Sequence, residues 1–144
     1  MINLIKISIF ELPELIRFCY TGDEGGLDKY YKNPIDVKSV DEAVDCTMGM
    51  INELELGHYK IMFGETVIGY SSICENCLYS FAINKWYRSN LIKDKWFEKV
   101  KELLGGKFMV VLYPENIRAI RFFERQGMEL VEGVQENMVT LLNN

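Results

Sequence analysis

The middle of the chain, residues 58–84, follows the period of two that is typical of β-strands. Two turn-forming pairs, Gly64-Glu65 and Glu75-Asn76, divide it into the segments HYKIMF, TVIGYSSIC and CLYSFAIN. Strands joined by such short turns pair as antiparallel neighbours. The chain must therefore build its core against an antiparallel meander of three strands.

Two segments with helical spacing precede this meander. The apolar positions of the first are Leu12, Leu15, Ile16 and Cys19, and Pro13 suits its first turn. The second is expected to begin at Ser39, because Glu42 follows three residues later and each side chain can accept the other's free backbone N–H. Two further helices are expected after the meander, one starting at Ser89 or Asn90 and one running from Asn116 to Gly127.

Four more strands complete the expected order. Residues 2–9 alternate, with Ile5, Ile7 and Ile9 on one face, and residues 107–113 form a continuous apolar run. The segments MELV and NMVTLL close the chain. These elements predict an α/β (α+β) fold: a mixed, mostly antiparallel central sheet of about seven strands flanked by about four helices, in the order β-α-α-β-β-β-α-β-α-β-β. No linker or repeat interrupts them, so residues 1–144 are expected to form a single domain.

Charge is distributed unevenly along the chain. There are 16 basic and 21 acidic side chains, giving a net charge of -5, yet the window from Lys85 to Arg125 holds ten basic and five acidic residues and is +5. A local anion site is expected there, whereas the overall acidity argues against nucleic-acid binding. No apolar run approaches the ~20 residues of a membrane helix, and the N-terminus lacks signal-peptide features, so a cytoplasmic location is expected.

Two segments resemble the GCN5-related N-acetyltransferase (GNAT) superfamily. In that family the last helix reads approximately Asn, any two residues, Ala, any two, an aromatic residue, Tyr, any three, Gly, Phe. The matching positions here are Asn116, Ala119, Phe122 and Gly127. The stretch INKWYR, residues 83–88, is similar to the family's strand that ends in a Tyr-Arg pair before the cofactor loop.

The resemblance implies the GNAT fold and an acyl-CoA-dependent N-acetyltransferase, which transfers an acetyl group from acetyl-CoA to an amine acceptor that it does not identify. The acetyl-CoA is expected between the strand ending near Asn84 and the helix beginning at Asn116, which Asn116 can cap. The expected cofactor-binding residues are Ile83, Asn84, Arg88, Ser89, Asn90, Leu91, Ile92, Lys93, Asn116, Ala119, Phe122 and Phe123. A homodimer or another protein partner is left open.

The cofactor loop departs from the family pattern. The family has Gln or Arg, any two residues, Gly, any residue, then Gly or Ala, and the matching run here is RSNLIK, residues 88–93. Both glycines are missing, so Leu91 and Lys93 would crowd a pyrophosphate that glycine N–H groups normally approach. Arg88, Lys93 and Lys95 are expected to compensate by charge, and a solvated helix face is the alternative reading of these cations.

The family's general acid is also missing. Many members use a tyrosine on the last helix to protonate the leaving thiolate, and Phe123 occupies that position. The candidate catalytic residues are therefore Tyr79, Ser80 and Tyr113, each of which can also serve packing or a hairpin hydrogen bond. The alternative function is a catalytically impaired GNAT-like domain that acts as a binding or structural component. Such erosion also resembles the acetyltransferase-like proteins of tailed bacteriophages, some of which are virion components.

Two other features bear on the site. The glycine-rich loop from Thr21 to Pro34 contains Tyr30 and Tyr31, which are candidates to line a pocket, and its acidic residues fit either a cationic acceptor or solvated charge. Cys74 and Cys77 have metal-ligand spacing, but a second pair of ligands is absent. Two thiols across a turn, and no metal, are expected.

Overall fold

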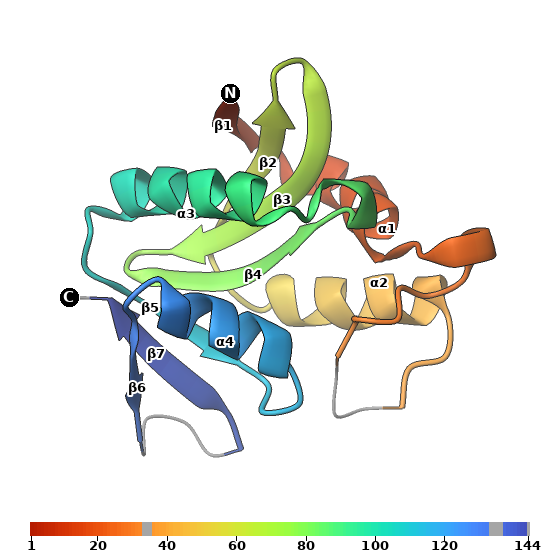
Figure 1. Cartoon of the computed structure of the whole chain (residues 1–144). Coiled ribbons are helices and arrows are strands. Elements are labelled where there is room, and N and C mark those ends of the chain that lie inside the picture. Colours follow the sequence, from red (N-terminus) through yellow and green to blue (C-terminus); the bar gives the residue numbers. More distant parts are fainter. Residues whose placement is uncertain (33–35, 133–136, 144) are drawn as a thin grey trace.

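A seven-stranded sheet in the order β1-β2-β3-β4-β5-β7-β6 forms the centre of the computed structural model, which describes residues 1–32, 36–132 and 137–143 (Figure 1). The strands are β1 Ile2–Ile7, β2 Gly57–Phe63, β3 Thr66–Cys74, β4 Cys77–Ile83, β5 Phe108–Leu112, β6 Glu129–Val131 and β7 Val139–Asn143. The α-helices are α1 Leu12–Tyr20, α2 Val40–Ile51, α3 Asn90–Leu104 and α4 Ile117–Arg125. All neighbouring strands are antiparallel except β4 and β5. The predicted fold class and element order are confirmed.

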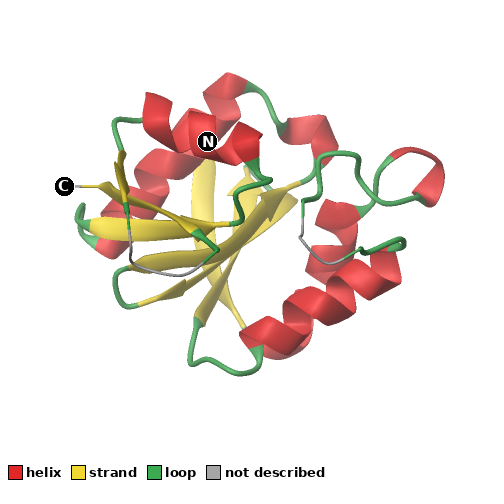
Figure 2. Cartoon of the chain, turned by 90° about the horizontal axis from the view of Figure 1, so that it is seen from below, coloured by secondary structure: helices red, strands yellow, loops and turns green. Residues whose placement is uncertain are grey.

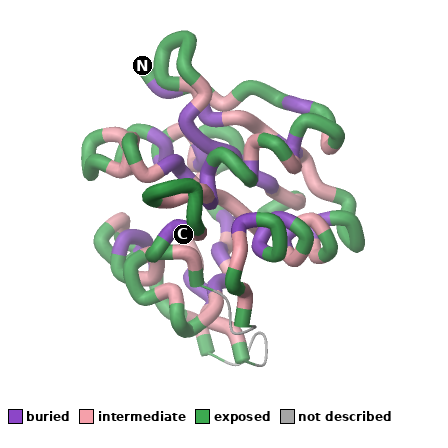
Figure 3. Tube along the Cα trace, turned by 90° about the vertical axis from the view of Figure 1, so that its right-hand side faces the viewer, coloured by how far each residue is buried: buried purple, intermediate pink, exposed green. Residues whose placement is uncertain are grey.

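Helices cover both faces of the sheet (Figure 2). One apolar cluster joins α3 and α4 to the strands through Trp96, Phe97, Phe122 and Phe123. A second cluster joins α1 and α2 to the opposite face around Tyr70. Buried positions accordingly concentrate on the strands and on the inward sides of the helices (Figure 3). The interior is therefore two cores separated by the sheet, and the site described below lies where the sheet opens between them.

The first strand is shorter than the alternation predicts. Its last residue is Ile7, because the next residue begins a 3-10 turn: Ser8 N–H donates to the Glu11 carboxylate at 2.9 Å in a capping box. Ile9 therefore lies outside the strand, and Ile5 is exposed on the free edge of the sheet. The expectation of one buried face through Ile5, Ile7 and Ile9 is wrong, since of these three only Ile7 is buried.

Helix caps agree with the sequence pattern only in part. The Ser39 hydroxyl accepts the Glu42 N–H at 3.1 Å as expected, but the Glu42 carboxylate accepts the N–H of Lys38 instead of that of Ser39. Asn116 makes no side-chain hydrogen bond to the start of α4, so its expected capping role is wrong. Gly127 does leave α4 in the left-handed conformation, at φ +92°.

Candidate functional site

A cavity opens where the parallel strands β4 and β5 separate. They pair only at Cys77 with Met109 and at Leu78 with Val110. Beyond these pairs, the rest of β4 and the end of β5 line a cavity of about 480 Å³. Helix α4 borders it on one side, and α1, α2 and the loop between them border it on the other (Figure 1). The edge of β4 that faces β5 thus offers backbone N–H and C=O groups to a ligand.

Most of the residues that the sequence singles out line this cavity. They are Tyr30, Tyr31, Tyr79, Ser80, Ile83, Arg88, Lys93, Tyr113, Asn116, Ala119, Phe122 and Phe123. Six others lie outside its lining: Asn84, Ser89, Asn90, Leu91, Ile92 and Lys95. The structure therefore gathers the candidate catalytic residues and the α4 residues, and leaves most of the expected phosphate loop beside the cavity.

Two of the outlying residues have structural partners. Asn84 is buried, donates to the Phe18 carbonyl at 2.9 Å and accepts the Trp86 N–H at 3.1 Å. Ser89 is the N-cap of α3, because its hydroxyl accepts the Ile92 N–H at 3.2 Å. These bonds set the path of the chain from β4 into α3.

Arg88, the first residue of the expected phosphate loop, is held by the protein itself. Its guanidinium donates to the buried carboxylate of Asp28 and, through Nε, to the Ile83 carbonyl at 2.7 Å. Asp28 also accepts the Tyr30 N–H at 3.1 Å. This pair connects the loop between α1 and α2 to the end of β4. The two residues are far apart in the sequence, so no local pattern predicts their contact.

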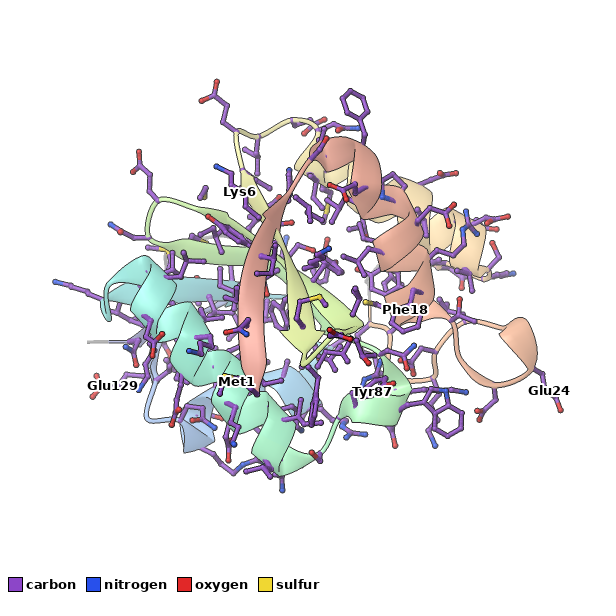
Figure 4. All side chains as sticks on the ribbon, turned by 90° about the horizontal axis from the view of Figure 1, so that it is seen from above. Met1, Lys6, Phe18, Glu24, Tyr87 and Glu129 are labelled. Carbon is purple, nitrogen blue, oxygen red and sulfur yellow. The ribbon has the colours of Figure 1, made fainter. Side chains whose placement is uncertain are left out.

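The other two acidic residues of this loop, unlike Asp28, lie outside the cavity lining. Asp23 pairs with Lys85, and Glu24 points outward at the far end of the loop (Figure 4). The three acidic residues that fitted a cationic acceptor are thus either neutralised by neighbouring cations or directed into solvent. They give no support to that acceptor.

Two cations at the mouth of the cavity have no acidic partner among the described residues. Within the described part of the chain, neither Lys93 nor Arg118 forms an ion pair. Lys93 Nζ lies 5.4 Å from the Phe122 ring centroid, and the Arg118 guanidinium lies 3.7 Å from that of Tyr30. Burial lowers the pKa of Lys93, and the nearby Arg118 and Arg125 lower it further. The mouth is therefore a site where an anion would relieve repulsion.

Comparison with known proteins gives the same architecture. No protein-family model matches the sequence, and no curated protein matches it. The structure of an acetyltransferase from Thermus thermophilus superimposes with a TM-score of 0.66 at 14% sequence identity; the match covers 99% of this chain and 96% of the Thermus chain. The PaiA N-acetyltransferase from Thermoplasma acidophilum, solved with coenzyme A, has a TM-score of 0.61 at 14% sequence identity; the match covers 100% of this chain and 99% of the PaiA chain. The GNAT domain of PAT from S. lividans has a TM-score of 0.63 at 12% sequence identity; the match covers 98% of this chain and 88% of that domain's chain.

The chain has the GNAT fold.

Phe123 occupies the position where the GNAT resemblance implies a tyrosine that acts as general acid, and its side chain is fully buried. Its ring packs against those of Trp96 and Phe81, with centroids 6.3 Å and 5.4 Å away. Phe123 therefore serves the core beneath the cavity and carries no proton to give. Any acid must come from another wall.

Hydroxyl groups on the sheet side form a continuous hydrogen-bonded chain. Ser80 bonds to Tyr70 at 2.7 Å, Tyr70 to Tyr20 at 2.9 Å, and Tyr20 to Thr47 at 3.1 Å. Tyr70 is fully buried, whereas the other three line the cavity. Burial raises the pKa of both tyrosines well above the usual value, so they stay neutral. Of these four residues, only Ser80 is a candidate from the sequence. The other three could not be predicted, because their contacts depend on how β3, α1 and α2 pack together.

Tyr79 and Tyr113 are the other candidate catalytic groups, and both face the cavity. The Tyr113 hydroxyl donates to Met50 Sδ at 3.1 Å. Burial raises the pKa of both phenols, and the nearby Cys77 adds to the effect on Tyr79. Both hydroxyls therefore remain protonated at neutral pH and can donate to a developing negative charge.

The paired cysteines lie across the turn between β3 and β4, as expected. Cys74 faces Cys77 in the last pair of that hairpin, and both are free thiols. Burial, followed by the neighbouring Cys74, raises the pKa of Cys77 to about 12. Over residues 1–32, 36–132 and 137–143, no three metal-binding side chains gather. Over the same residues, no helix has the length and apolar character needed to cross a membrane.

Proposed function

We propose that this chain is an acyl-CoA-dependent N-acetyltransferase that moves the acetyl group of acetyl-CoA to an amine. The observation that carries the proposal is the cavity at the divergence of β4 and β5, with cations at its mouth and hydroxyls on its walls. The PaiA protein, solved with coenzyme A, has the same fold and supports the assignment. In this proposal residues 1–144 act as one domain.

The donor lies between β4 and α4. The free edge of β4 near Ile83 pairs with the amides of the pantetheine arm, and Ala119 leaves room for that arm against α4. Lys93 and Arg118 hold the phosphates through side-chain charge, in place of the missing glycine loop. Arg88 contributes less, because Asp28 already occupies its guanidinium.

The transfer itself needs little from the protein besides positioning. The neutral amine nitrogen attacks the thioester carbon, a C–N bond forms and the C–S bond breaks. The hydroxyl of Ser80 or Tyr113 gives its proton to the leaving thiolate and regains one from the nitrogen, so one proton passes overall from nitrogen to sulfur. Holding the two reactants together supplies much of the rate, and the missing tyrosine acid costs roughly 10²–10⁴-fold.

Thermal unfolding with added acetyl-CoA tests the donor site. At 100 times its dissociation constant, a ligand of the folded state stabilises it by about 2.7 kcal/mol. Mass spectrometry of an amine panel then tests transfer, since the free thiols of this chain would interfere with thiol reagents. Absence of stabilisation at millimolar acetyl-CoA removes the proposed function.

A second candidate is a GNAT-like domain that binds without catalysis. The pairing of Arg88 with Asp28 and the buried Phe123 favour it, because both leave residues of the GNAT pattern in structural use. Binding of acetyl-CoA without turnover of any amine, or recovery in a stoichiometric complex with another chain, supports this candidate.

A further inference from the structure

The side of the cavity next to α1, α2 and β4 has a different lining from the mouth. Five aromatic or thioether side chains meet there, from α1, the loop after it, α2, β4 and the position after β5: Tyr20, Tyr31, Met50, Tyr79 and Tyr113. The rings of Tyr20 and Tyr31 lie 4.8 Å apart, and Tyr113 contacts Met50 through its hydroxyl. We call these five residues the aromatic end. Its walls suit a flat or apolar group.

Charge around the cavity is positive, and the described lining residues include no unpaired acidic group. The charged lining residues in the described part of the chain are Lys32, Arg88, Lys93, Arg118 and Asp28, which sum to +3 (four cations less one anion). Asp28 is already bound to Arg88. A ligand with a second ammonium group would therefore meet like charge and find no unpaired carboxylate lining the cavity within residues 1–32, 36–132 and 137–143.

The aromatic end also bears on how the amine becomes a nucleophile. The strand from Leu78 to Ile83 has no glutamate to serve as a base. Transfer of an amine from water to an apolar, aromatic wall disfavours its charged form and lowers its pKa. The surroundings of Tyr113 show this effect, because burial is the main reason that its own pKa is raised. Desolvation at the aromatic end thus supplies neutral amine without a carboxylate.

We propose that the acceptor is a primary amine on an aromatic or similarly apolar group, with no second positive charge. This inference rests on the proposed acetyltransferase function. The apolar group packs between Tyr31 and Tyr79, and the amine points along β4 toward Ser80 and the thioester. Polyamines and lysine side chains on basic peptides are poor acceptors, because their additional ammonium groups face Lys32 and meet no unpaired carboxylate among the described lining residues.

Competition between defined amines tests the acceptor class. 2-Phenylethylamine, ethanolamine and spermidine are each supplied with acetyl-CoA, and the N-acetyl product is quantified by mass spectrometry. We expect kcat/KM for 2-phenylethylamine to exceed the values for the other two amines by roughly tenfold or more, the scale set by burying an apolar group in a fitted pocket. Equal or better use of spermidine overturns the inference.

A pair of matched variants locates the effect. Tyr31→Ala is expected to lower kcat/KM for 2-phenylethylamine about tenfold and to change that for ethanolamine little, because only the aromatic amine reaches this wall. Tyr59→Ala removes the same side chain from β2, outside the cavity, and should leave the ratio of the two amines unchanged. An equal loss for both amines in Tyr31→Ala contradicts the aromatic end as the acceptor site.

Failure of the acceptor inference and failure of the proposed function give different results. If acetyl-CoA does not stabilise the fold, the proposed function fails and this inference with it. If acetyl-CoA stabilises the fold and spermidine is acetylated, only the acceptor class is wrong. If acetyl-CoA binds and no amine is acetylated, thermal shifts of the coenzyme A complex decide: stabilisation by 2-phenylethylamine but not by spermidine supports the aromatic end, and any other pattern overturns it.

Discussion

The mouth and the aromatic end of one cavity are built from opposite kinds of chemistry. At the mouth, Lys93 and Arg118 are charged side chains on helices, and the neighbouring Arg88 is paired with Asp28. At the aromatic end, neutral hydroxyls and rings connect to the core through Tyr70. The two ends should therefore respond differently to mutation. Changes at the mouth should alter donor affinity, except at the buried ion pair, whereas changes at the aromatic end should alter acceptor use and changes at the hydroxyls behind it should alter stability.

The largest expected effect comes from breaking the buried ion pair. Arg88→Ala leaves the Asp28 carboxylate buried without its cation, which costs about 3 kcal/mol of unfolding free energy. Lys85→Ala breaks the pair with the exposed Asp23 and should cost under about 1 kcal/mol. Urea unfolding measures both. Similar losses for the two variants would show that Asp28 and Arg88 do not form the structural anchor described above.

Removal of the buried hydroxyl that lies behind the aromatic end should have the next largest effect. Tyr70→Phe takes a hydrogen-bond partner from both Tyr20 and Ser80, at an expected cost of about 1–3 kcal/mol in urea unfolding. The control, Tyr59→Phe, removes a hydroxyl outside this chain of bonds and should cost less than about 0.5 kcal/mol. A neutral Tyr70→Phe would mean that the hydrogen-bonded chain adds nothing to stability.

The strands and helices of this site could be predicted from the sequence, but the contacts that join them could not. Alternation over residues 58–84 fixes three strands, because one face of each must be buried. Asp28 meets Arg88 across 60 positions, and Tyr70 meets Ser80 only through the register of β3 with β4. Such pairs depend on how whole elements pack, and no local pattern carries that information.

Predictions from local sequence fail at residues that can serve either of two roles. Asn116 stands where a helix cap is expected, yet its side chain makes no such bond and instead lines the cavity. The acidic residues of the loop between α1 and α2 fitted a cationic acceptor in the sequence, whereas in the structure Asp28 holds Arg88. Residues near a functional site are those most often drawn away from their usual structural role.

At the mouth, loss of one cation should weaken donor binding with little loss of stability. Lys93→Ala and Arg118→Ala are each expected to raise the dissociation constant of acetyl-CoA about tenfold, or about 1.4 kcal/mol, because each removes a charge-assisted phosphate contact. Arg121→Ala, on the exposed side of α4 and outside the cavity lining, should change it little. Calorimetric titration distinguishes them, and equal effects at all three positions would indicate a general charge effect without a defined phosphate site.

The smallest expected effect is a difference in how tyrosines at the two ends ionise. The nearby Lys29, followed by Arg118, lowers the pKa of the exposed Tyr30 at the mouth, whereas burial raises the pKa of Tyr20 and Tyr70 well above 10. In an absorbance titration of phenolate, Tyr30 should therefore ionise first among the three, and the two buried phenols should ionise only as the fold is lost.

Arg118→Ala should move the early phase toward the ordinary tyrosine pKa near 10, and Tyr30→Phe should abolish it. The sign for stability follows from linkage. Because the folded state releases the Tyr30 proton more readily, this group adds stability as pH rises through its lowered pKa, and that contribution disappears as pH falls. The buried phenols act in reverse and oppose folding above the tyrosine pKa of the unfolded chain. An early phase that persists in Tyr30→Phe would assign it to another tyrosine and remove the electrostatic contrast between the mouth and the aromatic end.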